Sequence, residues 1–67
     1  MIRQLVRSSN VHSVGYDNGV VEVAFRNGYV YHYHGVSLYT FNAFLRAPSK
    51  GRFVHYALAR YRYRRVA

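Results

Sequence analysis

The stretch VVEVAFRNGYVYHYH, residues 20–34, decides the fold because it holds two strand-like segments joined by an Asn-Gly pair. An Asn-Gly pair between such segments is the strongest short-range signal of a β-hairpin. Residues 11–16, VHSVGY, form a third strand-like segment and are followed by Asp-Asn-Gly at 17–19. We therefore expect a three-stranded antiparallel meander, with strands near 11–16, 20–26 and 29–34.

The geometry of the Asn27-Gly28 turn determines which side chains of this hairpin share a face. A two-residue type I′ turn would place the apolar residues of 20–26 beside the two histidines. A type I turn with a glycine bulge shifts the pairing by one residue and places them beside the three tyrosines. Burying both imidazoles would demand hydrogen-bond partners for each, so we expect the bulged register. In that register Val21, Val23, Phe25, Tyr29, Tyr31 and Tyr33 face the core, and His32 and His34 face outward.

The apolar spacing becomes helical after residue 36. Ser37 and Ser49 are candidate N-caps, and Pro48 should end the first helix at or before Ala47. We expect a single α+β domain over residues 1–67, with helices near 38–47 and 50–59 packed on one sheet face and a basic tail at 60–67. The tail could fray from the helix, run extended or add a short strand. The expected core residues are Val21, Val23, Phe25, Tyr31, Tyr33, Leu38, Phe41, Phe44, Leu45 and Phe53.

Positive charge is concentrated at the C-terminal end of the chain. The net charge is +8, and the only acids are Asp17 and Glu22, both in the first half. This asymmetry favours a polyanionic partner, with nucleic acid first and an anionic membrane second, whereas the alternative is a solubilising tail. A contiguous patch of Lys50, Arg52, Arg60, Arg62 and Arg64 would favour a polyanionic partner, whereas scatter of these cations would count against one. The cations of the second half are Arg46, Lys50, Arg52, Arg60, Arg62, Arg64 and Arg65.

Two motifs in this basic half are candidate binding elements. APSKGRF, residues 47–53, would open the second helix, where free N–H groups and two cations attract anions; the alternative is ordinary helix punctuation. RYRYRR, residues 60–65, interleaves arginines for phosphates with tyrosines for unpaired bases; the alternative is that its tyrosines pack, as we expect for Tyr61. The candidate nucleic-acid or anion-binding residues are Ser49, Lys50, Gly51, Arg52, Arg60, Arg62, Tyr63, Arg64 and Arg65.

The composition argues against several other classes of protein. Cysteine is absent, and two acids in separate segments make a poor catalytic carboxylate pair. His32 and His34 share one side of a strand, but no spacing forces a third metal ligand beside them. We expect no catalytic residue, no metal site, no cofactor and no small-molecule substrate. No membrane span or signal peptide is recognisable, so we expect a cytoplasmic protein without membrane association.

The chain resembles the KTSC domain, a small module named after the C-terminus of some lysyl-tRNA synthetases and also found as free-standing bacterial and phage proteins. The resemblance implies a compact α+β domain without catalytic activity and with suggested RNA binding. A proline common before the first helix is Ser37 here. The matching segments are SSNVHSVGYD (8–17), VEVAFRNG (21–28), Tyr31 and Tyr33, GV (35–36), APSKGRF (47–53) and RYRYRRV (60–66).

These observations together favour a small non-catalytic module that binds nucleic acid, RNA above all, through its Arg/Tyr-rich C-terminal half. The alternative is a protein-interaction module, for example a phage or bacterial adaptor or an inhibitor of a cellular protein. Exposed tyrosines and arginines serve either role, because both residue types are common anchors of protein interfaces.

Overall fold

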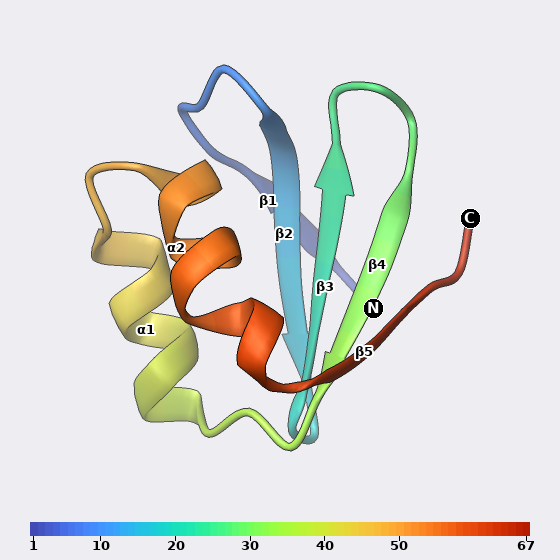
Figure 1. Ribbon diagram of the computed structural model, residues 1–67, viewed down its shortest axis with the longest axis vertical. Helices are drawn as coiled ribbons and strands as arrows, with labels where there is room; N and C mark the ends of the chain where they lie inside the picture. Colours follow the sequence, from blue (N-terminus) through green and yellow to red (C-terminus); the bar gives the residue numbers. More distant parts are fainter.

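A computed structural model describes residues 1–67 as an α+β domain with a five-stranded antiparallel sheet in the order β1-β2-β3-β4-β5. Both helices lie on one side of the sheet (Figure 1). The fold class is therefore confirmed, but the sheet has five strands rather than three. The elements are β1 (Arg3–Leu5), β2 (Val11–Asp17), β3 (Val20–Phe25), β4 (Val30–His34), α1 (Leu38–Arg46), α2 (Lys50–Tyr56), a 3₁₀ turn η1 (Leu58–Arg60) and β5 (Arg62–Arg65).

The hairpin of β3 and β4 adopts the bulged register. Val21 pairs with Tyr33 and Val23 with Tyr31, while Glu22 pairs with His32 on the opposite face. Gly28 has a φ of 96°, a conformation that side chains with a Cβ rarely adopt, and this residue is the bulge. The valines and tyrosines therefore share the face that carries the helices, as the hairpin sequence predicts.

The core lies between this face and the helices. Phe44 and Leu58 are fully buried against valines of β2 and β3, and Phe44 also stacks on Phe53 with ring centroids 5.1 Å apart. Phe25, Tyr31, Leu45 and Phe53 are half-buried and pack against this cluster. The fully or nearly buried apolar residues are Val11, Val14, Val21, Val23, Ala24, Tyr33, Val36, Phe41, Phe44 and Leu58.

Two core predictions are wrong. Leu38 is 57% exposed because it lies in the first turn of α1, at the rim of the domain, where it lines an open hollow with Ile2 and Tyr16. Tyr29 is 45% exposed because it precedes β4, at the end of the hairpin that the helices do not cover. The buried stripe of α1 therefore starts at Phe41.

Side-chain caps define where the helices begin. The hydroxyl of Ser37 accepts a hydrogen bond from the backbone N–H of Thr40, and that of Ser49 accepts one from Arg52. Pro48 follows α1, which ends at Arg46. The second helix is shorter than expected: α2 ends at Tyr56, and the chain tightens into η1 before it reverses into β5.

The two edge strands are the main correction to the expected topology. β1 has no buried residue and pairs with β2 through its backbone. β5 is the part of the basic tail that adds a strand, and it pairs with β4 so that Tyr33 opposes Tyr63. The last strand of the sheet therefore comes from after the helices, and residues from the two ends of the chain form its two edges.

Candidate functional site

The helices leave part of their own sheet face uncovered. In Figure 1 they lie over the β2 side of the sheet, whereas β4 and β5 extend away from them. Tyr63 is 51% exposed and Tyr29 is 45% exposed, but Tyr33 beside them is only 4% exposed. We call the residues Phe25, Tyr29, Tyr31 and Tyr63 the tyrosine surface, with Tyr33 forming its buried inner margin.

Except for Tyr29, the rings of this surface contact one another or Tyr33 across the three strands β3, β4 and β5. The centroid of Tyr63 lies 5.5 Å from that of Tyr33 and 6.0 Å from that of Tyr31. Phe25 meets Tyr31 edge to face at 5.6 Å. Such aromatic contacts add stability beyond burial and favour a fixed position for the rings of Phe25, Tyr31 and Tyr63.

The side chain of an arginine lies over the face of one ring of the tyrosine surface. The guanidinium carbon of Arg65 lies 4.3 Å from the ring centroid of Tyr29, within the range of a cation–π interaction. Burial, together with the smaller effect of the nearby Tyr31 and Tyr63 hydroxyls when they ionise, raises the pKa of Tyr33 to about 12. The inner margin of the tyrosine surface is therefore a neutral phenol, and its outer end carries the cation of Arg65.

The alternation of β5 separates Arg62 and Arg64 from Tyr63 and Arg65. Arg62 opposes His34 and Arg64 opposes His32, so these four side chains lie on the face without helices. Glu22 lies on the same face, where it accepts a hydrogen bond from His32 at 2.7 Å and forms an ion pair with Arg3 at 3.3 Å. We call His32, His34, Arg62 and Arg64 the open-face patch.

A third basic region lies at the start of α2. Ser49, Lys50, Gly51 and Arg52 line a cavity of about 420 Å³ together with the loop between β1 and β2. Lys50 is 9% exposed, and its ammonium group donates a hydrogen bond to the carbonyl of Ala47. That bond satisfies the end of α1 and fixes the lysine. The other lining residues are Arg7, Ser8, Ser9, Asn10, Pro48, His55 and Tyr56.

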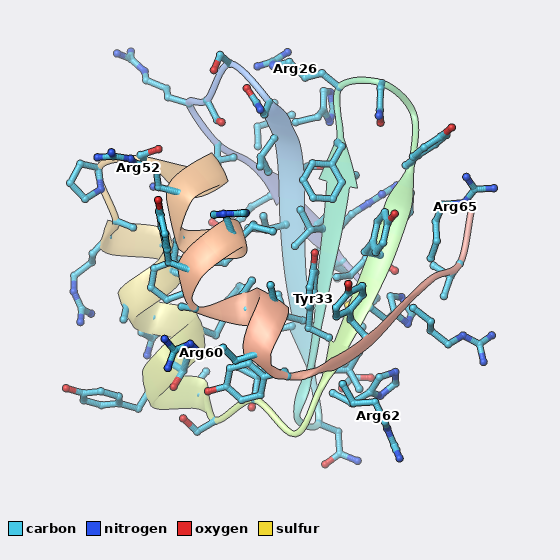
Figure 2. The ribbon with its side chains drawn as sticks, in the orientation of Figure 1. Arg26, Tyr33, Arg52, Arg60, Arg62 and Arg65 are labelled. Atoms are coloured by element: carbon cyan, nitrogen blue, oxygen red, sulfur yellow. The ribbon has the colours of Figure 1, made fainter.

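The basic residues of the second half do not form the single patch that the sequence analysis expects of a polyanion-binding protein. Arg52, Arg60, Arg62 and Arg65 lie on separate parts of the molecule (Figure 2). The structure brings Ser49 to Arg52 together, places Arg62 with Arg64, and places Tyr63 with Arg65. Arg60 stands apart from these groups on η1, where it lines a hollow with Tyr56 and Tyr61.

Sequence reasoning missed parts of two of these regions. It treated Tyr29 and Tyr31 as core residues, although Tyr29 is exposed and Tyr31 is only half-buried. It also overlooked Arg7, which reaches the cavity from a loop far from α2 in the sequence. Alternation in 29–34 places the tyrosines on one face, but no sequence signal reports how far the helices extend over that face.

Two other observations bear on the nature of the site. No three His, Asp or Glu side chains lie close enough together to hold a metal ion. The helices are too short and too polar for any of them to cross a lipid bilayer.

Comparisons with known proteins identify the family of the chain. The sequence profile of the KTSC domain matches residues 7–63. A crystal structure of a KTSC domain protein from Yersinia pestis superposes with a TM-score of 0.90 at 37% identity, covering 98% of this chain and 97% of that one. None of the curated proteins compared with the chain matches it. The profile match and the shared fold together establish that the chain belongs to the KTSC domain family.

Proposed function

We propose that the protein is a non-catalytic module that binds single-stranded nucleic acid, RNA above all, by stacking bases on the tyrosine surface. The observation that carries this proposal is the exposed pair of Tyr63 on β5 and Tyr29 just before β4, with Tyr63 51% exposed and Tyr29 in contact with Arg65. Only part of the interleaved Arg-Tyr motif contributes to the tyrosine surface, because alternating residues of β5 lie on opposite faces of the sheet.

Aromatic rings on a sheet suit unpaired bases for a physical reason. Every base has a flat π-face, so stacking tolerates any sequence, and each stack contributes about 1–3 kcal/mol. Duplexed bases are already stacked on their neighbours and offer no free face. The protein's net charge of +8 attracts the phosphates of the same strand and makes binding weaken as salt rises.

The test is a titration of a labelled single-stranded oligouridylate at low and moderate salt, with wild type and Tyr63→Ala. We expect Tyr63→Ala to weaken binding by about 1–3 kcal/mol because one stacking ring is lost. Tyr39→Ala is the matched control, since Tyr39 is 80% exposed on α1 and lies outside the tyrosine surface. Equal loss in both variants, or no loss in either, contradicts the proposal.

A second candidate function, protein interaction, has its own observation. Ile2, Leu38 and Tyr39 are 93%, 57% and 80% exposed, and Ile2 and Leu38 line one hollow beside Phe41. Apolar side chains exposed together often mark a protein contact. A partner recovered from nuclease-treated bacterial lysate by wild type and Tyr63→Ala, but lost with Leu38→Asp, would support this candidate. Recovery only of proteins carried on nucleic acid would count against it.

A further inference from the structure

We propose that the open-face patch contacts the phosphates of the nucleic acid whose bases stack on the tyrosine surface, so that one strand passes around the edge of β5. This inference rests on the proposed function and assigns a separate role to Arg62 and Arg64. It follows from the position of β5 as the outermost strand of the sheet, because both of its faces and its outer edge are open.

The register of β5 places two kinds of ligand-binding group on opposite sides of one strand. Tyr63 contacts Tyr31 and Tyr33 on the helix side, while Arg62 and Arg64 oppose His34 and His32 on the other side. All residues of β5 are exposed. In Figure 2 Arg62 projects away from the helices, beyond the β5 edge. A nucleic-acid strand that contacted only the tyrosine surface would make no contact with Arg62 or Arg64.

The charges of the open face leave these two arginines free for an anion. Both ion pairs of the protein involve Glu22, which is bound by Arg3 and His32. Asp17, the other acid, lies in the same cross-strand row as His34 and Arg62, but three strands from β5, and it forms no ion pair. Arg62 and Arg64 therefore have no carboxylate partner, and guanidinium groups bind phosphate oxygens through paired N–H donors.

The spacing of the two arginines suits a phosphate chain. Side chains two residues apart on a strand point the same way and lie roughly 6.6 Å apart along it. Two neighbouring phosphates of an extended single strand can therefore be contacted at once. The imidazoles of His32 and His34, with ring centroids 6.3 Å apart, lie alongside as additional polar groups.

The experiment uses two labelled probes of equal length, an oligouridylate and an abasic oligodeoxynucleotide that carries phosphates without bases. Salt dependence of binding is measured for wild type, Arg62→Ser/Arg64→Ser and Tyr63→Ala. We expect the double variant to lower the slope of log K against log salt by about 1.4, since each phosphate contact on a single strand contributes about 0.7. Tyr63→Ala should weaken binding of the oligouridylate and leave binding of the abasic probe unchanged.

Two further variants distinguish specific phosphate contacts of Arg62 and Arg64 from a general effect of the protein's net charge. Arg26→Ser/Arg46→Ser removes the same charge from exposed positions outside the three candidate regions and should keep the wild-type slope. Arg62→Lys/Arg64→Lys retains the charge and should also keep the slope, while circular dichroism confirms that each variant folds. An equal loss of slope in the Arg26/Arg46 variant, or abasic binding unaffected by Arg62→Ser/Arg64→Ser, overturns the inference. Oligouridylate binding unaffected by Tyr63→Ala overturns the proposed function instead, and failure of wild type to bind either probe overturns both.

Discussion

One face of a single sheet divides into a covered half and an uncovered half. On the covered half, valines of β2 and β3 lie beneath Phe44 and Leu58 and are fully buried. On the uncovered half, tyrosines of β4 and β5 continue the same face, but Tyr63 remains 51% exposed. Residues on one face of one sheet therefore experience different environments, because the two short helices do not extend far enough to cover all five strands.

The covered half therefore contributes most of the folding stability, whereas the uncovered half carries the residues of the proposed function. The covered half removes branched and aromatic side chains from water, which is the main source of folding free energy in a domain of this size. The uncovered half contributes less burial and keeps rings available. Tyrosine suits such a border, because its ring packs against neighbours while its hydroxyl remains near water.

The largest expected effect comes from Phe44→Ala. Phe44 is fully buried against the sheet and stacks on Phe53, so its truncation leaves a cavity and should lower the free energy of unfolding by about 3–5 kcal/mol. Tyr63→Ala on the uncovered half should cost only roughly 1 kcal/mol. Urea denaturation measures both values. Similar losses in the two variants would remove the distinction between the halves.

The next largest loss of stability is expected at Gly28, the bulge that sets the register of the hairpin and so places the tyrosines on this face. Gly28 has a φ of 96°, and no atom lies within 4 Å of the position a Cβ would occupy. Gly28→Val should therefore lower the free energy of unfolding by about 1–2 kcal/mol through backbone strain alone. Gly28→Asn is the matched control, because asparagine tolerates positive φ and should cost less. Equal thermal stability of wild type and the valine variant would contradict the bulge.

A smaller loss of stability is expected from a change at the start of α1, one of the helices over the covered half. The hydroxyl of Ser37 accepts a hydrogen bond from Thr40 at the start of α1, so Ser37→Ala should cost about 1 kcal/mol. Ser37→Asp should retain most of the stability, because a carboxylate caps the same N–H and complements the helix dipole. Thermal unfolding of the three proteins checks the order. A loss in the aspartate variant as large as that in the alanine variant would show that the cap contributes little.

Much of this arrangement could be predicted from the sequence. The hairpin turns, the serine caps and Pro48 are local signals whose chemistry determines the backbone around them. The face carrying the valines and tyrosines followed from the cost of burying two imidazoles. By contrast, β1 is three residues long and buries none of them, so it has no hydrophobic pattern to detect. The Arg-Tyr alternation of β5 was compatible with a strand, but only pairing with β4 selects it.

The candidate site was harder to predict because it depends on contacts between distant segments. Exposure of Tyr29 follows from where the helices stop, which is a property of the packed domain. Arg7 and Arg52 line the same cavity although they are far apart in the sequence. The expected single patch of cations did not form, because α2, η1 and β5 carry their cations to separate parts of the molecule and alternation along β5 sends Arg64 and Arg65 to opposite faces.

The smallest expected signal comes from Tyr33, which lies on the border between the halves. Its pKa is raised to about 12, first by burial and then by the hydroxyls of Tyr31 and Tyr63. A tyrosine in the unfolded chain ionises near pH 10. The stability contributed by the neutral Tyr33 is therefore fully present below about pH 10, and it is lost as the pH rises toward 12.

The ultraviolet absorbance of phenolate follows the titration of the protein's eight tyrosines, and Tyr33 contributes one component of that signal. Tyr33→Phe should remove the component that ionises last and keep the ring in place. Tyr63→Phe should leave that component present and lower its midpoint, because one of the neighbouring phenolates that disfavours ionisation of Tyr33 is removed. If both variants lose the same component, Tyr33 and Tyr63 share one environment, and the border between the buried and exposed halves does not run between them.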